Sequence, residues 1–476
     1  MSEKDLWRLS ATETAARTTA GDVSAEATIG AAIARMEAVN PRLNAVVESL
    51  AEEARERAVA LDKARAAGTA YGPLHGVPVT IKVNVDQKGH ATTNGVVALK
   101  DLIAPADAPI VDNLQKAGAV VIGRTNTPEF SFRADTDNPL YGRTHNPWGD
   151  HLSPGGSSGG AGSAVMAGIG ALAHGNDIGG SLRFPAAANG AVTVKPGLGR
   201  VPAYNPSQTA ERGMLSQAMS VQGLIVRSAE DLHLGMPSAI ATDPRDPFHV
   251  PLPWRGAPLE GPIKVGFTKE TYEFDLHPEV SAALDTARDA LVDAGYQVEE
   301  VEPPLLRDCG MEGYRTLMGE VLALMEPAIR AQGSQTIQDI FDEYFTQFVP
   351  YKGDDLLGMM AKRTHYARVW SLFQEEYPLL LCPFLPQPFF VPDRDTQGPE
   401  GVREVLGSAL WSYSMNFMGL PAANVPAKLS DLPLGPTPMN VQIVARRWRE
   451  DLAVDAAMAI EARVGRLCDM LWARMG

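Results

Sequence analysis

The chain has 476 residues, 21% of them charged, and a formal net charge of −15. With no basic block or stripe in the sequence, this acidity argues against direct binding to nucleic acid or to an anionic membrane surface. The cysteines at 309, 382 and 468 are odd in number and far apart, and no signal-like or membrane-length apolar run occurs, so we expect a cytoplasmic enzyme without a disulfide framework or a zinc site.

The first third of the chain alternates helical and strand patterns. A helix capped by Ser24 is predicted to end before Pro41, and a second one to span residues 49–67. The β-branched run at 76–83 indicates a buried strand, and a helix at 110–116 is followed by a strand at 119–122. This alternation is typical of a layered α/β fold with a substantially parallel sheet.

The same pattern returns in the second half. The predicted strands there lie at 263–267, 296–301, 379–382 and 439–445. Helices are predicted at 278–294 and across 308–377. The Pro-rich stretches contain aromatic residues and therefore indicate loops and not flexible linkers. We expect one domain over residues 1–476, with a large mixed, substantially parallel β-sheet core covered by helices.

Two glycine- and serine-rich segments are the most informative part of the sequence. They are S-P-G-G-S-S-G-G-A-G-S at 153–163 and D-I-G-G-S-L-R-F-P at 177–185. Neither has the spacing of a phosphate-binding loop. Residues 155–159 match the G-x-S-x-G pattern of a nucleophile elbow, but glycine-rich loops match so short a pattern easily. Taken alone, these segments leave a catalytic loop and a purely structural loop both open.

Three motifs in order resemble the amidase signature family. They are G-V-P-V-T-I-K at 76–82, G-G-S-S-G-G at 155–160 and the segment at 177–185, and the resemblance is strong over about residues 71–201. It implies the amidase signature fold and a serine-type hydrolase acting on linear amide C–N bonds, with no cofactor and no metal. Two positions depart from the family pattern: Val83 replaces the usual Asp, and Asn176 replaces the usual Ser or Thr.

The resemblance also implies a role for each motif residue. Ser181 would be the nucleophile that carries the acyl-enzyme, Ser157, after a cis peptide bond, the proton relay, and Lys82 the base. To accept a proton Lys82 must be neutral, and burial would have to lower its pKa by about three units, roughly 4 kcal/mol. The oxyanion hole is expected to consist of the backbone amides of Ile178, Gly179, Gly180 and Ser181. The side chains of Ser158, Asp177 and Arg183 are expected to support the structure of the site.

The substrate is less constrained than the chemistry. Apolar segments near the motifs favour a small-molecule amide with an apolar or aryl group. The residues we expect to line its pocket are Phe130, Phe132, Tyr141, Trp411, Tyr413, Met415 and Phe417. Esters and carbamates stay open as substrates, because the same nucleophile attacks them. We expect a monomer or homodimer.

Two alternative functions remain at this point. A Ser-His-Asp esterase or carbamate hydrolase would use His174, or a histidine further along the chain, as its base. An amidotransferase subunit that acts on charged transfer RNA would work with a partner chain, without gripping the RNA itself. A catalytically silent subunit is disfavoured because Lys82, Ser157 and Ser181 are all present.

Overall fold

One β-sheet runs through the chain. The computed structural model describes residues 2–69 and 72–475, so the expected start of the signature core at residue 71 lies outside the described residues. The strands of the sheet, in spatial order, are β1 (Val46–Ser49), β3 (Val120–Thr125), β2 (Pro78–Lys82), β4 (Leu172–Asp177), β6 (Val221–Val226), β5 (Val192–Lys195), β10 (Ala422–Leu432), β11 (Gly435–Ala445), β9 (Leu379–Pro383), β7 (Lys264–Phe267) and β8 (Gln297–Glu300).

The sheet is mixed, as the sequence predicts. Parallel pairing joins β3 to β2 and β2 to β4 on one side, and β9 to β7 and β7 to β8 on the other. The strands between these two blocks, and β1 at the edge, pair antiparallel. Strands β2 and β9, which have parallel neighbours, are buried along their whole length, which explains why most of their residues are apolar.

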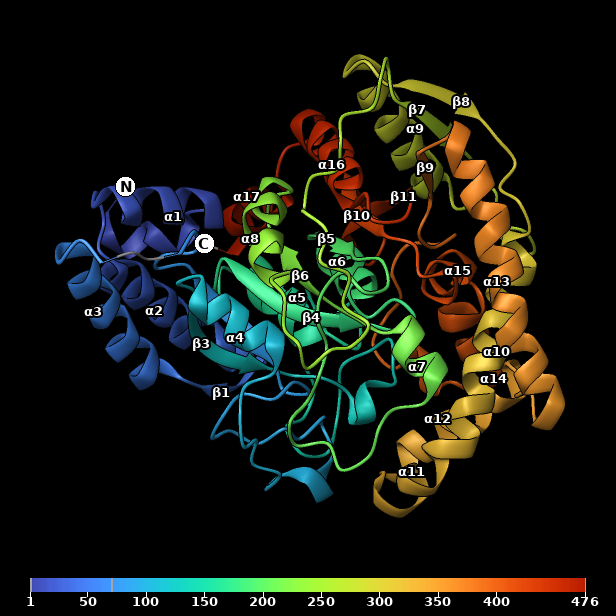
Figure 1. Ribbon diagram of the computed structural model, residues 1–476, viewed down its shortest axis with the longest axis horizontal. Helices are drawn as coiled ribbons and strands as arrows, with labels where there is room; N and C mark the ends of the chain where they lie inside the picture. Colours follow the sequence, from blue (N-terminus) through green and yellow to red (C-terminus); the bar gives the residue numbers. More distant parts are fainter. Residues whose placement is uncertain (1, 70–71, 476) are drawn as a thin grey trace.

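Helices cover both faces of the sheet (Figure 1). The α-helices are α1 (Ala11–Ala20), α2 (Ala25–Leu43), α3 (Ala51–Ala66), α4 (Pro109–Lys116), α5 (Gly159–Met166), α6 (Arg183–Asn189), α7 (Met214–Met219), α8 (Glu230–Ala239), α9 (Pro278–Asp293), α10 (Leu306–Leu324), α11 (Glu326–Gln332), α12 (Gln335–Gln347), α13 (Gly353–Glu376), α14 (Gly398–Val402), α15 (Leu410–Met418), α16 (Glu450–Val464) and α17 (Leu467–Met475). Short 3-10 turns lie at Glu3–Arg8, Val97–Leu99, Glu129–Ser131 and Arg394–Thr396, and a π-helical turn at Arg403–Gly407.

The two faces of the sheet have separate apolar cores. Helices α1, α4, α8, α9 and α16 pack on one face. Helices α5, α6, α10, α15 and α17 contribute to the core on the other face. In Figure 1 the N-terminal helices α2 and α3 lie at the end of the molecule near β1 and β3, and α10–α13 form the opposite side. The two glycine-rich segments belong to the second face, because α5 and α6 begin within them.

Several predicted boundaries differ from the structure. Helix α2 continues past Pro41 to Leu43, because a proline in the last turn removes a single ladder bond and Asn44, with φ 47°, ends the helix in a left-handed conformation. Residue 49, expected to start a helix, ends the short strand β1. The helical region expected at 308–377 is divided into α10–α13.

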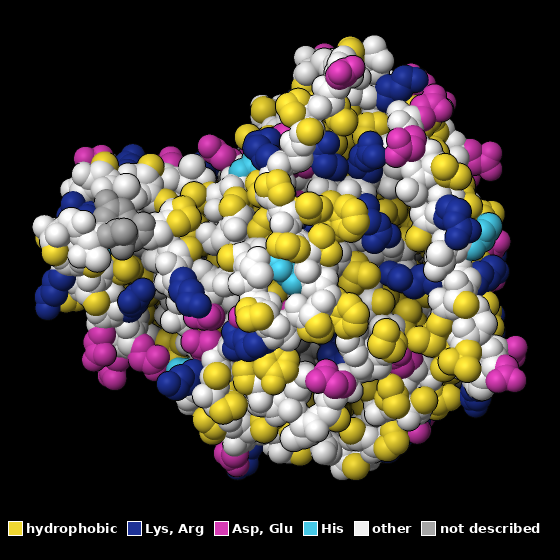
Figure 2. Space-filling model, viewed as in Figure 1, with side chains coloured by type: hydrophobic (Ala, Val, Ile, Leu, Met, Phe, Trp, Pro, Cys, Tyr) yellow, Lys and Arg dark blue, Asp and Glu magenta, His cyan; other side chains and the backbone are white. Residues whose placement is uncertain are grey.

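The surface view agrees with the charge pattern of the sequence. Figure 2 shows basic side chains interspersed with acidic ones on the viewed face and not gathered into one stripe. Among the described residues, every helix is too short or too polar to cross a bilayer.

Candidate active site

Lys82 ends strand β2 at a point where two parallel strands run side by side. Val79 and Thr80 of β2 pair with Leu172 and Ala173 of β4. The carboxyl ends of parallel neighbours lie at the same sheet edge, so Lys82 comes next to the residues that end β4. Helix α5 begins within the first glycine–serine segment, at Gly159, and brings that segment to the same edge.

The Lys82 amino group contacts only neutral side-chain oxygens. Its Nζ atom lies 2.7 Å from Ser157 Oγ, 3.1 Å from Ser158 Oγ and 2.8 Å from Asn176 Oδ1. Asn176 is held in turn by Asn84, whose Oδ1 accepts from Asn176 Nδ2 at 2.9 Å. Lys82 therefore has a complete set of hydrogen-bond partners that includes no carboxylate.

Burial lowers the pKa of Lys82. Its side chain is fully buried, and the loss of hydration lowers its pKa well below the ordinary value, while the nearby charge of Asp177 acts in the opposite direction. Since desolvation dominates, the neutral amine is favoured. A neutral amine beside a serine hydroxyl can accept a proton from it.

The first glycine–serine segment turns sharply before it reaches Lys82. Gly155 has φ 76°, a left-handed conformation that favours glycine, and the peptide bond between Gly156 and Ser157 is cis. A side chain at Gly156 would collide with the carbonyl oxygen of Arg133, 2.3 Å from the position of its Cβ. These two glycines let the chain approach its neighbours and direct Ser157 toward Lys82.

The second segment is organised by an ion pair. Asp177 accepts hydrogen bonds from Arg183 Nε and Nη2, each at 3.1 Å, and both side chains are buried. Burial alone would raise the pKa of Asp177, but the Arg183 charge and its hydrogen bonds lower that pKa to about 2. Asp177 also accepts from the amides of Gly180, at 2.7 Å, and Leu182, at 3.1 Å. The loop that presents Ser181 is therefore wrapped around one carboxylate.

This arrangement divides the four expected oxyanion-hole amides. The Gly180 amide donates to Asp177 Oδ1 inside the loop, so it is not available to an oxyanion, and the expectation that it belongs to the oxyanion hole was wrong. Within the described part of the chain, the amides of Ile178, Gly179 and Ser181 have no hydrogen-bond acceptor. Three free N–H groups around a half-buried serine suit the binding of a developing negative charge.

Two cavities meet at Ser181. The larger has a volume of about 560 Å³, within the usual range of small-molecule sites, and Ser157 and Asn176 also line it. The smaller, of about 40 Å³, is mostly apolar and aromatic. Its main side chains are Phe132, Ile178, Phe184, Tyr314, Leu317, Tyr344, Leu406 and Tyr413.

The cavities contain some of the expected pocket residues and exclude others. Phe130, Phe132 and Tyr413 line them. The expectation for Tyr141, Trp411, Met415 and Phe417 was wrong. On α15, Tyr413 lines the smaller cavity together with Ser181, whereas Trp411 Nε1 donates to the Glu270 carbonyl. Met415 is fully buried, and Phe417 packs near Tyr366. The Tyr141 carbonyl accepts from Asn44 Nδ2 at the end of α2.

The structure also adds residues that sequence reasoning missed. Tyr314 and Tyr344 come from α10 and α12, where nothing in the sequence distinguishes them from core aromatics. Phe130 and Ser131 have φ values of 54° and 56° and form part of the larger cavity, a backbone feature that no residue pattern announces. Asn84, two residues after Lys82, could have been found from its proximity to the motif.

The histidines lie elsewhere. His174 is buried, accepts the Lys82 amide at 3.4 Å and contacts Gln222 at 2.9 Å. Burial lowers its pKa to about 4, so it is neutral at pH 7. His145 pairs with Asp150 near the surface, and His151 contacts a backbone carbonyl. In the described ranges no histidine lines either cavity, and no group of three or more potential metal ligands occurs.

Comparison with known proteins defines the class. Residues 27–454 match the family described as Amidase. The chain is 47% identical to the indoleacetamide hydrolase of Bradyrhizobium diazoefficiens over 99% of its own length and 89% of that protein. It is 33% identical to an acylamidase of Rhodococcus erythropolis, with 97% of each chain covered. The chain therefore belongs to the amidase signature family, and it is an amide hydrolase.

Other relatives show how broad the family is. The structure of 6-aminohexanoate cyclic dimer hydrolase bound to substrate superposes with a TM-score of 0.82, at 28% identity over 97% of this chain and 98% of the other. One subunit of the glutamyl-tRNA(Gln) amidotransferase of Moorella thermoacetica is 32% identical over 96% of this chain and 97% of its own. The family thus includes both small-molecule hydrolases and amidotransferase subunits.

Proposed function

We propose that the chain hydrolyses a carboxylic amide through an acyl-enzyme on Ser181, with Lys82 as base and Ser157 as relay. The observation that carries this proposal is the 2.7 Å contact of Lys82 Nζ with Ser157 Oγ, inside a buried set of neutral partners. Ser157 and Ser181 both line the larger cavity, where an amide can reach them.

In the proposed reaction, one proton moves from Ser181 through Ser157 to Lys82. Ser181 Oγ attacks the amide carbon while its proton passes to Ser157, whose own proton passes to neutral Lys82. The tetrahedral oxyanion accepts hydrogen bonds from the free amides of Ile178, Gly179 and Ser181. Lys82 then returns a proton through Ser157 to the leaving nitrogen, the C–N bond breaks, and ammonia or an amine departs. Water then attacks the acyl-enzyme while its proton passes through Ser157 to Lys82. The proton returns to Ser181 Oγ as the acid is released.

We propose an aryl or otherwise apolar acyl group for the substrate. The aromatic side chains beside Ser181 support this, because Tyr314 and Tyr413 stack at a centroid distance of 4.1 Å and present apolar rings next to the serine. The relative named indoleacetamide hydrolase supports an arylacetamide. Indole-3-acetamide is the first compound to test.

Neither alternative function fits as well. A histidine base is disfavoured by the positions of His145, His151 and His174. The amidotransferase subunit is a more distant relative, at 32% identity against 47% for the hydrolase. Turnover of indole-3-acetamide by the purified chain alone supports the hydrolase. Activity that appears only with a partner chain and charged transfer RNA supports the amidotransferase.

The nucleophile is tested by Ser181→Ala, with Ser163→Ala as a matched control. Ser163 is a buried serine on α5 that binds the His145 carbonyl and lines neither cavity. We expect Ser181→Ala to lose hydrolysis of indole-3-acetamide and labelling by a fluorophosphonate, while Ser163→Ala keeps both. Mapping of the label to Ser157 would contradict the assignment.

Three further properties belong to this proposal. A single domain over residues 1–476 is supported by the sheet, which joins strands from residue 46 to residue 445. We propose a cytoplasmic location from the pattern of the three cysteines in the sequence. We also propose a monomer or homodimer, which sedimentation of the purified protein will distinguish.

A further inference from the structure

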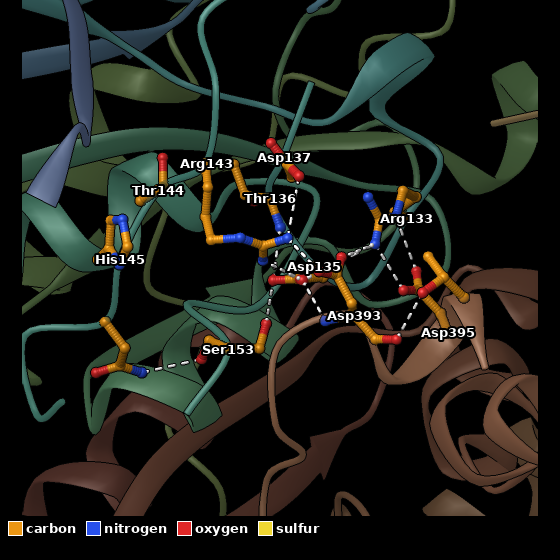
Figure 3. Close-up of polar contacts among 12 residues, drawn as sticks. Arg133, Asp135, Thr136, Asp137, Arg143, Thr144, His145, Ser153, Asp393 and Asp395 are labelled. Carbon is orange, nitrogen blue, oxygen red and sulfur yellow. Dashed lines mark hydrogen bonds and ion pairs between the residues drawn. The ribbon is translucent and has the colours of Figure 1, made fainter. Parts of the chain in front are cut away.

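An ion-pair cluster lies beside the first glycine–serine segment. Figure 3 shows Asp135 between Arg133 and Arg143, with Asp393 and Asp395 from a distant part of the chain. Arg133 donates to Asp395 from Nε at 3.0 Å and from Nη2 at 2.7 Å. Arg143 donates to Asp393 at 2.5 Å. The cluster joins the loop after the 3-10 turn at Glu129–Ser131 to the loop before α14, whose continuation supplies Leu406 to the aromatic cavity.

Asp135 is the fully buried centre of this cluster. Its Oδ2 atom accepts from Arg143 Nη1 at 2.8 Å and from the Asp393 amide at 2.9 Å. Its Oδ1 atom accepts from the Thr136 amide at 2.9 Å and from Ser153 Oγ at 2.5 Å. A buried carboxylate with all these donors is fixed in position, because any rotation would leave a charged oxygen without a partner.

Ser153 connects the fixed carboxylate of Asp135 to the glycine turn by hydrogen bonds. While it donates to Asp135, its Oγ atom accepts from the Gly155 amide at 3.0 Å. The Gly155 carbonyl accepts from Thr136 Oγ1 at 2.7 Å. The residue two positions before Ser157 is therefore held on both sides by Asp135 and its neighbour. Ser157 Oγ lies 2.7 Å from Lys82 Nζ, and a shift of the backbone at Gly155 would change this distance.

We propose that Asp135, acting through Ser153, is a positioning residue for Ser157. It contacts neither substrate nor reacting atoms. It fixes the turn at Gly155 so that Ser157 Oγ stays within proton-transfer distance of Lys82. The inference rests on the proposed relay role of Ser157. Because displacements of about 1 Å can cost about 100-fold in rate, a small relaxation of this turn is measurable.

The cleanest test is Ser153→Ala. This variant removes the bridge between Asp135 and Gly155 but leaves the ion pairs of Asp135, Arg133 and Arg143 in place. The matched control is Asp137→Asn, which weakens a 3.0 Å contact of Arg143 at the edge of the cluster, away from Gly155. Both variants are compared by thermal midpoint and by kcat and KM on indole-3-acetamide and on the p-nitrophenyl ester of indole-3-acetic acid.

A positioning role has a distinct kinetic signature. We expect Ser153→Ala to lower kcat for the amide about 10- to 100-fold with little change in KM, and to affect the ester less, because a p-nitrophenolate leaves without a proton from the relay. Asp137→Asn should keep wild-type kcat for both substrates. Ser157→Ala serves as reference and should show the same amide-to-ester imbalance in stronger form.

The outcomes separate the inference from the function on which it rests. Ser153→Ala with wild-type amide turnover, or with amide and ester rates that fall together in proportion to the folded fraction, would overturn the positioning role while Ser157→Ala still shows the imbalance. A Ser157→Ala enzyme with wild-type amide turnover would overturn the relay itself, and this inference with it.

Discussion

Asn176 Oδ1 lies 2.8 Å from Lys82 Nζ, where the family pattern has the shorter side chain of Ser or Thr. The amide oxygen is a neutral acceptor, so it orients the lysine without adding the negative charge that would favour the ammonium form. Asn84 fixes the orientation of this amide through a pair of hydrogen bonds, at 2.9 Å and 3.2 Å. The departure from the family pattern thus leaves Lys82 free to be neutral.

Replacing this amide with a carboxylate should raise the pKa of Lys82. An anion at 176 stabilises the ammonium form, so in Asn176→Asp the lysine becomes neutral only at higher pH. We expect the rising limb of kcat/KM against pH to move to higher pH and the rate at pH 7 to fall. Asn176→Ser, which restores the family residue, is the control and should keep the limb near its wild-type position. A limb that moves to lower pH in Asn176→Asp would contradict the role of Lys82 as base.

Removal of the base should abolish this limb. In wild type, kcat/KM rises with pH as Lys82 loses its proton and then reaches a plateau. Lys82→Ala should lose the limb and slow amide hydrolysis by about 10²- to 10⁴-fold, with a smaller loss for activated esters. Stopped-flow or steady-state rates on an amide and ester pair from pH 5 to 10 will measure both effects. An unchanged amide profile in this variant would remove the protein from the Ser–Ser–Lys mechanism.

His174 should affect stability and leave the pH limb of activity in place. Its pKa is about 4 in the folded protein and 6.5 when unfolded, so the unfolded chain binds the extra proton between these values. Stability should therefore fall by about 3 kcal/mol as the pH drops from 6.5 to 4, and level off below. His174→Gln should lack this part of the loss, as chemical unfolding at pH 7.5, 5.5 and 4.5 will report. If the His174 variant instead lost the rise of kcat/KM with pH, the histidine-based hydrolase would be favoured.

The aromatic cavity should control acyl-group selectivity. Tyr413→Leu removes the ring stacked on Tyr314 and should lower kcat/KM for indole-3-acetamide about 10-fold relative to propionamide. Phe417→Leu is the control on the same helix, because Phe417 packs in the core and lines neither cavity. It should lower the thermal midpoint and leave the ratio unchanged. Equal loss for both amides in Tyr413→Leu would exclude a role in selectivity.

The sequence locates the residues of the proposed triad more closely than it locates the pocket around them. Lys82 and Ser157 could be found because they lie in short ordered motifs that resemble those of a known family, and the structure brings both residues to one sheet edge. Tyr314 could not be found, because its helix contributes few residues to the cavity and many to the core, and only tertiary packing decides which. Trp411 shows the same problem from the other side, since an apolar residue two positions from Tyr413 points away.

The fold shows a similar division. Buried strands such as β2 and β9 consist mostly of apolar residues and were predicted. Strand β4 was not, because it ends in Gly175, Asn176 and Asp177, which have low strand propensity, and the last two of these contact Lys82 and the loop of Ser181. Functional constraint therefore hid one of the strands that carries the function.

The register between β2 and β4 makes the enzyme sensitive to a kind of damage that its motifs do not reveal. Val79 pairs with Leu172 and Thr80 with Ala173, which brings Lys82 level with the end of β4. Since successive side chains of a strand point to opposite faces, sliding β2 by one residue would bring Ile81 or Val83 to that level and turn the amine away. A one-residue deletion within β2 would then silence the protein although Lys82, Ser157 and Ser181 are all still encoded, so the presence of these three residues in a divergent copy does not guarantee that the copy is active.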